Sequence, residues 1–284
     1  MKSATLTRTQ SKIIRNIVLY VFLTLFSIIC ILPLLWMIST SLKSGNIIFE
    51  SPPRWLPDGF HFENYKKAVQ EIPFLQYFFN STFITVLRIV AEVFVSALVA
   101  FGFAKFDFPG KNLWFLLLLS TIMLPSEVTL IPVFQLFTKL GWVNTFLPLT
   151  VPAFFGGQAV FVFLLRQFFM AQSNELMEAA MIDGANKFSI FLKIYLPISK
   201  PALITVGIFS FQGSWNDLMG PLIYLNDSSK YTLQLGLAMF NGMTKIEWGP
   251  LMAASLLTLL PILIVFFAAQ KYFVEGITFS GIKG

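Results

Sequence analysis

Four ionisable residues stand inside long apolar runs of this sequence, where a charged side chain is costly. Arg88 and Glu92 share one run, Glu127 lies in a second and Asp217 in a third. At the centre of a bilayer each such residue costs roughly 2.5–3.5 kcal/mol on insertion scales, so it must face a partner or a wet cavity. These residues are therefore the first candidates for a path that carries a polar solute.

The spacing of Arg88 and Glu92 is i,i+4, so the two side chains can pair along one face of a helix. Two interpretations stay open for them: an internal ion pair that pins helices together, or part of the lining of a transport path. Glu127 stands between Pro125 and Pro132. It either contributes to the same path or lies near the membrane interface and is solvated.

The tripeptide Trp215-Asn216-Asp217 lies near the end of the apolar run that contains Asp217, Ala202–Leu225. An indole face next to an amide and a carboxylate is suited to a polyhydroxylated solute, because the ring takes apolar sugar faces and the polar atoms take hydroxyls. The alternative is an interfacial belt, where Trp is common in membrane proteins. The residue types alone leave both interpretations open.

The composition defines the class of protein that must position these residues. Of 284 residues, 56% are hydrophobic and only 12% are charged, whereas soluble domains have ~25% charged residues. This excludes a soluble enzyme, a disulfide scaffold and a disordered chain, and it indicates a polytopic membrane protein. With one Cys and one His, neither an intrachain disulfide nor a metal cluster is expected. The basic residues lack the aromatic interleaving of a nucleic-acid groove.

Six apolar runs are long enough to cross a bilayer, which takes ~20 residues per helix. We therefore expect an all-α membrane protein with six transmembrane helices between residues 17 and 270. The first run has a basic flank like that of a secretory signal, but it exceeds the ~7–15 apolar residues of a cleaved one. The runs are Ile17–Ile38, Phe78–Ala104, Leu113–Phe137, Phe146–Leu165, Ala202–Leu225 and Leu251–Ala269.

The distribution of Lys and Arg predicts the orientation. With the N-terminus inside, twelve basic residues lie in cytoplasmic segments and seven in external ones, as the positive-inside rule requires. Segments 1–16 and 271–284 are then cytoplasmic, and segment 43–77 is external. The loop 166–201, between the fourth and fifth runs, is also cytoplasmic.

The loop 166–201 contains the signals of a short helix. Ser173 and Asn174 are residues that cap helix starts, and Glu175 and Glu178 fall in the first turn, where the helix dipole favours acids. Gly184 can end the helix in a left-handed conformation. A second helical stretch, 187–195, follows before the fifth run.

The two faces of this expected helix differ in character. An amphipathic helix on lipid would have Lys or Arg on its polar edge, but the edge here is acidic, which favours a groove on a cytoplasmic protein. Small alanines allow close approach of another backbone, and methionines give an adaptable docking surface. The acidic edge consists of Asn174, Glu175 and Glu178, and the opposite face of Leu176, Met177, Ala179, Ala180 and Met181.

The same loop resembles the EAA loop of bacterial ABC importer permeases. The residues that carry the resemblance are Glu178, Ala179, Ala180, Asp183, Gly184, Ala185, Phe191, Ile194, Pro197 and Pro201. The rest of the chain agrees, in order, with the smaller permease of carbohydrate importers of the maltose type. The matching stretches are PPRWLPDGFHFENYKKA (52–68), FGFAKFDFPGK (101–111), LPSEVTLIPVF (124–134), SWNDLMGPL (214–222) and GITFSGIKG (276–284).

The resemblance implies a subunit of an inner-membrane assembly rather than an enzyme. Its partners would be a second permease, two ATP-binding subunits that hold ATP-Mg, an extracytoplasmic solute-binding protein and membrane lipid. The EAA helix would sit in a cleft of one ATPase subunit. The tail, with Gly276, Gly281, Lys283 and Gly284, would reach between the ATPase subunits.

The chain itself lacks the G-x-x-x-x-G-K-[ST] phosphate loop of ATPases, so hydrolysis is expected on a separate chain and no cofactor is expected on this one. Two other classes remain as alternatives. A secondary, ion-coupled transporter would normally show internal repeats, and a structural membrane subunit of a larger complex would leave the acidic helix unexplained.

Overall fold

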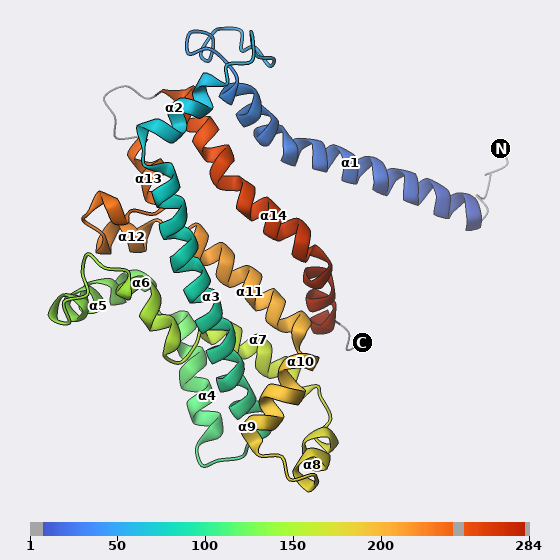
Figure 1. Cartoon of the computed structure of the whole chain (residues 1–284). Helices are drawn as coiled ribbons and strands as arrows, with labels where there is room; N and C mark the ends of the chain where they lie inside the picture. The colour runs from blue at the N-terminus through green and yellow to red at the C-terminus, as the bar shows by residue number, and fades with distance from the viewer. Residues whose placement is uncertain (1–7, 241–246, 282–284) are drawn as a thin grey trace. The chain divides into compact units, whose positions relative to one another are not determined.

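The computed structural model describes residues 8–240 and 247–281, with side chains described for 12–240 and 247–271. Every regular element in these ranges is a helix (Figure 1). The chain divides into two compact units. The first unit runs to Glu71 and includes Phe240–Leu257; the second comprises Ile72–Met239 and the chain from Thr258 onward. The all-helical class predicted from the apolar runs is confirmed.

The first unit contains α1 (Arg8–Ser41), α2 (Glu63–Glu71) and the beginning of α14 (Trp248–Gly281). The apolar window of α1 has no buried residue. Beyond α1, the buried Lys43 lies 4.0 Å from the centroid of Trp36 and donates to the carbonyl of Arg54. Burial lowers the pKa of this lysine, and Asp58 partly offsets that effect. Lys43 thereby ties the segment around Arg54 to the end of α1.

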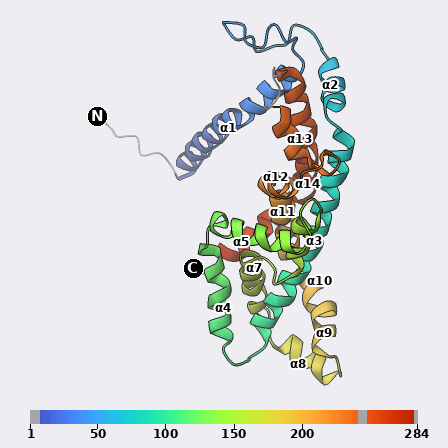
Figure 2. The ribbon, with the colours of Figure 1, turned by 90° about the vertical axis from the view of Figure 1, so that its left-hand side faces the viewer.

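The second unit contains the remaining helices (Figure 2). Its longer helices are α3 (Phe74–Lys105), α4 (Lys111–Ser120), α5 (Ser126–Lys139), α7 (Ala159–Met170), α8 (Glu175–Ile182), α11 (Lys200–Trp215) and α13 (Leu233–Phe240). Its shorter ones are α6 (Leu147–Thr150), α9 (Lys187–Ile190), α10 (Leu196–Ile198) and α12 (Met219–Tyr224). Single turns occupy Thr121–Met123, Val151–Phe154 and Ser228–Lys230, and a π-helical turn occupies Phe191–Tyr195.

Helix α3 is the centre of the second unit and packs against α7 and α11. Ala97 and Ala100 on α3 are completely buried, and such small residues let helix backbones approach closely in membrane proteins. The larger members of this core are Phe101, Val162, Leu165, Phe169, Phe191 and Tyr195. The core therefore joins the end of α3 to the loop that follows α7.

Within the described residues, four helices are long and apolar enough to cross a membrane, or six if each of two bent pairs is one span. The third predicted run is not one straight helix: Lys111–Met123 and Ser126–Lys139 meet at 100°. Leu124 is extended at this break, as expected for a residue before proline. The fifth run is also interrupted, because α11 ends at Trp215 and α12 begins at Met219.

Candidate functional site

Helix α8 begins where the capping residues predicted, but the two capping side chains act differently. Ser173 Oγ accepts from the backbone N–H of Glu175 at 3.2 Å. Asn174 does not cap; its Oδ1 accepts from Lys105 Nζ at 2.8 Å. Lys105 also donates to the carbonyl of Gln172 at 2.7 Å. The last residue of α3 therefore fixes the start of α8.

The other end of α8 is closed by a glycine, as the sequence predicted. Gly184 has a φ of +82°, which costs a residue with a side chain about 1–2 kcal/mol. The N–H of Ala185 donates to the carbonyl of Ala180 at 2.9 Å, and the N–H of Gly184 to that of Met181 at 3.1 Å. This pair of bonds is a Schellman motif, so the direction in which the chain leaves α8 is fixed.

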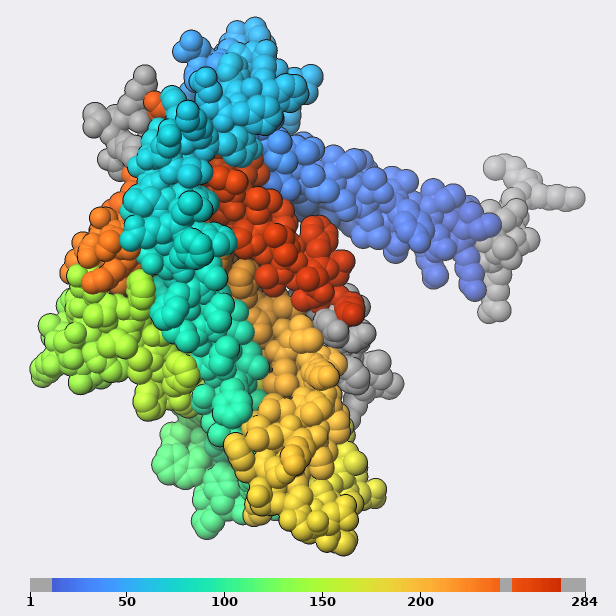
Figure 3. Space-filling view, viewed as in Figure 1, coloured from blue at the N-terminus to red at the C-terminus, as the bar shows by residue number. Residues whose placement is uncertain are grey.

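The exposed face of α8 is narrower than the sequence suggested. Ala180 is buried and Met177 packs against the core of the second unit, so these two anchor the helix instead of facing a partner. Ile182 is 86% exposed, which is unusual for a large apolar residue. The outward residues are Glu175, Leu176, Glu178, Ala179, Met181, Ile182 and Asp183. Figure 3 shows this part of the surface, coloured yellow, at one end of the second unit.

The segment after α8 leads back into the core through a π-helical turn. Phe191 and Tyr195, at the two ends of the turn, are completely buried. The hydroxyls of Tyr195 and Ser199 are buried and have no hydrogen-bond partner among the described residues. Helix pieces 187–198 and 200–215 meet at 81°. Pro197 is exposed, and Pro201 lies in the first turn of α11.

A polar stripe along α3 carries the second group of candidate residues. Its members recur at intervals of three or four, which places them on one helix face. Thr85 Oγ1 lies 3.1 Å from Ser214 Oγ on α11, and Ser81 Oγ accepts from the N–H of Leu233 at 2.9 Å. The stripe consists of Ser81, Thr85, Arg88, Glu92 and Ser96. From the sequence we predicted only the two charged members, although the three hydroxyl residues continue the same three- and four-residue spacing.

Arg88 bridges two carboxylates from different parts of the chain. Its Nη2 lies 3.2 Å from Glu92 Oε1 and its Nη1 3.4 Å from Asp217 Oδ2. Asp217 Oδ1 also accepts from the N–H of Gly220 at 3.0 Å. The Glu92 side chain is buried, whereas Arg88 and Asp217 are 20% and 26% exposed. The predicted pair therefore exists, and Asp217 makes it a triad with a formal charge of −1.

The fourth predicted run is interrupted at residues 155–158, between the turn Val151–Phe154 and α7. This interruption lies against Ser96, the last residue of the polar stripe. Gly157 has a φ of +69°, and a Cβ built on it would lie 2.5 Å from Ser96 Oγ and 2.9 Å from Ser96 Cα. Only glycine fits so close to α3. Within the irregular stretch 155–158, Gly157 is the residue that lies against α3, whereas Phe155, Gly156 and Gln158 are exposed.

The remaining candidates do not join the triad. Trp215 is buried between Phe78 and Phe211, and its Nε1 donates to the carbonyl of Thr258 at 3.1 Å. Its ring therefore packs inside the second unit, with 3% of the residue exposed. Asn216 is exposed and bonded to Gln212 and Gln234.

Glu127 is exposed in the first turn of α5, and Ser126 Oγ donates to it at 3.2 Å. Gly276 and Gly281 lie on the helical backbone of α14. Lys283 and Gly284 fall outside the described residues.

Residues 92–279 match the family described as "Binding-protein-dependent transport system inner membrane component". The chain belongs to this family. It is therefore a multi-pass membrane permease of a transport system, and the matched region contains Glu92, Asp217 and the whole of α8.

Several named relatives are similar over most of the chain. The "Probable ABC transporter permease protein YurM" of Bacillus subtilis is 37% identical over 93% of this chain and 88% of its own length. The "Trehalose/maltose transport system permease protein MalG" of Thermococcus litoralis is 31% identical over 97% and 99%. The "Arabinooligosaccharides transport system permease protein AraQ" of Halalkalibacterium halodurans is 38% identical over 73% and 74%.

A solved structure shares the fold of this permease. It is described as a bacterial ABC transporter involved in the import of the acidic polysaccharide alginate. The matching chain is 24% identical, with a TM-score of 0.82 over 95% of this chain and 100% of that one. The match shows that the described helices have the arrangement of an ABC importer permease.

Proposed function

We propose that this chain forms half of the translocation pathway of an ATP-driven importer for a sugar or related polyhydroxylated solute. The relatives named for arabinooligosaccharides, for trehalose and maltose, and for diacetylchitobiose support this solute class. The other half of the pathway belongs to a second permease. An extracytoplasmic binding protein delivers the solute, and both termini are cytoplasmic.

The docking element in this proposal is α8, and its exposed face carries the argument. Ile182 is 86% exposed beside acidic Glu175 and Glu178, a combination that suits a protein groove better than anionic lipid headgroups. The helix is also fixed at both ends, by Lys105 and by the turn at Gly184. A rigid element of this kind can transmit the closure of two ATPase subunits to the core around Phe191.

The energy requirement explains why a rigid connection matters. To move a two-state transporter from about 1:99 to about 99:1, its ligands must favour one state by about 5.5 kcal/mol. The permease contains no phosphate loop, so ATP bound on the separate subunits must supply that preference through α8. The path in this proposal is lined by the Arg88, Glu92 and Asp217 triad, together with Asn216 and Glu127.

The test is ATPase co-purification with a charge reversal on α8. We expect Glu178→Lys to lower both the recovery of the ATPase subunit and ATP-dependent uptake in proteoliposomes, because the reversed charge faces the groove. Glu50→Lys is the control: it reverses an exposed charge that pairs with Arg54 in the segment expected outside. Unchanged ATPase recovery in Glu178→Lys would contradict the proposal. Uptake driven by an ion gradient without ATP would support a secondary transporter instead.

A further inference from the structure

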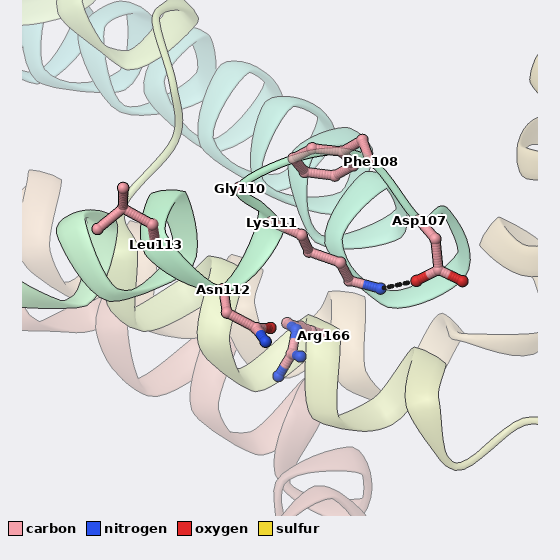
Figure 4. Close-up of a pocket in the computed structure, with 7 residues that line it drawn as sticks. All are labelled: Asp107, Phe108, Gly110, Lys111, Asn112, Leu113 and Arg166. Carbon is pink, nitrogen blue, oxygen red and sulfur yellow. Dashed lines mark hydrogen bonds and ion pairs between the residues drawn. The ribbon is translucent and has the colours of Figure 1, made fainter.

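A cavity of about 400 Å³ lies at the turn between α3 and α4, apart from the residues considered so far. Figure 4 shows its lining, in which Lys111 and Asn112 at the start of α4 lie across from Arg166 of α7. Polar and charged groups from two separate helices thus meet in one hollow. Both helices belong to the second unit.

The protein holds the guanidinium of Arg166 in place, but it does not accept all of its hydrogen bonds. Its Nε donates to the carbonyl of Phe103 at 3.4 Å, and its central carbon lies 4.1 Å from the centroid of Phe115. Its two terminal nitrogens have no protein acceptor within the described ranges. A planar fork with free donors matches two oxygens of a phosphate.

Other donors surround the same hollow. The N–H of Lys111 donates to the carbonyl of Phe108 at 3.2 Å. The N–H groups of Asn112 and Leu113, also in the first turn of α4, have no acceptor within the helix, and the N-cap, Gly110, has no side chain to offer one. The Asn112 side chain points toward Arg166 (Figure 4). Lys111 Nζ pairs with Asp107 at 3.1 Å, but the Asp107 side chain is fully exposed, and exposed pairs of this kind are weak. The lining keeps a formal charge of +1.

The position of the cavity relative to the membrane-spanning helices indicates which phosphate-bearing molecule can reach it. The α3 span ends at Lys105 and the next apolar helix pair begins at Lys111, so the cavity lies where the hydrocarbon layer ends. Both views place this turn at the same end of the second unit as α8 (Figures 1 and 2). We propose that the cavity binds the phosphate of an anionic phospholipid in the leaflet on the α8 side. Basic pockets beside membrane helices are known to recognise such headgroups.

The test is a lipid titration of the purified transporter by native mass spectrometry. We expect phosphatidylglycerol to bind at least about tenfold more tightly than phosphatidylcholine. Arg166→Gln combined with Lys111→Gln should lose about tenfold of that affinity, the scale of one charge-assisted hydrogen bond. Lys12→Gln, which removes an exposed charge of α1, should change it by less than about twofold. Arg166→Lys, which keeps the charge, should bind with intermediate affinity and provides a second variant if the double variant fails to insert.

Four results would overturn the proposal. The first is equal binding of the two lipids, and the second is equal phosphatidylglycerol binding by the wild type and the double variant. The third is displacement of phosphatidylglycerol by millimolar inorganic phosphate, which would make the site one for free phosphate. If the double variant instead loses the ATPase subunit but keeps its lipid preference, the cavity is a protein contact and the lipid proposal is wrong.

Discussion

Arg88 holds a buried carboxylate, Glu92, and a partly exposed one, Asp217, at the same time. The pair within α3 follows from i,i+4 spacing, which is a local property of the sequence. The contact with Asp217 spans 129 positions. It exists because α11 ends at Trp215 and turns the next residues toward α3, and no local spacing rule contains that information.

We expect Arg88→Met to destabilise the permease by about 3–5 kcal/mol, because it leaves the Glu92 charge buried without a partner. The double variant Arg88→Met/Glu92→Leu should recover much of the loss, since it removes the orphaned charge. Arg54→Met breaks the exposed pair with Glu50 and should cost less than about 1 kcal/mol. Thermal unfolding in detergent measures all three. A wild-type melting temperature for Arg88→Met would contradict this account of the triad.

The tyrosines offer a matched comparison. Tyr195 has a buried hydroxyl without a partner in the described chain, whereas Tyr65 Oη lies 2.9 Å from Ser41 Oγ. Tyr195→Phe should therefore leave stability unchanged or raise it, and Tyr65→Phe should lower it by about 1 kcal/mol. The melting temperatures of the two variants in detergent, each compared with the wild type, test this prediction. If Tyr195→Phe is the more damaging change, its hydroxyl has a partner in the membrane-embedded state.

Among the helices, α8 is the one whose limits the sequence predicted best. Ser173 and Gly184 mark its ends through local capping chemistry, and both act as expected. Its rotation was not predictable, because Met177 and Ala180 turn inward to meet a core assembled from α3, α7 and the 191–195 turn. The 100° bend in the third run could not be predicted either, because a proline indicates that a helix is interrupted but not the angle between the two helices that result.

The glycine that ends α8 can be tested by a graded series. Gly184→Ala should destabilise the left-handed end of the helix by about 1–2 kcal/mol. Gly184→Asn should be milder, because asparagine tolerates this conformation better. Gly45→Ala is the control, since a Cβ there meets nothing within 4 Å. Hydrogen exchange of the α8 amides should rise in the order Gly45→Ala, Gly184→Asn, Gly184→Ala. Equal exchange in all three would show that the cap does not hold the helix.

For the whole molecule, the exposed apolar surfaces are those of a membrane subunit. Neither the apolar window of α1 nor Ile182 on α8 is covered by the described chain. The composition predicted a membrane protein directly. A chain with 56% hydrophobic and 12% charged residues has too little polar surface to cover its apolar side chains, so lipid and other chains must cover them. The sequence does not identify the solute because, in the function proposed above, the triad and the exposed Asn216 line only one side of a path that a second permease completes.

The central claim is that α8 docks onto a separate ATPase subunit, and site-specific photo-crosslinking in native membranes tests it most directly. A photoreactive amino acid replaces Ile182, and the control replaces Ile131, which is 65% exposed on α5. We predict that the Ile182 variant yields an adduct with the mass of this permease plus one ATPase subunit, and that the Ile131 variant does not. Adducts of the Ile182 variant with lipid alone, or with an extracytoplasmic protein, would contradict the claim.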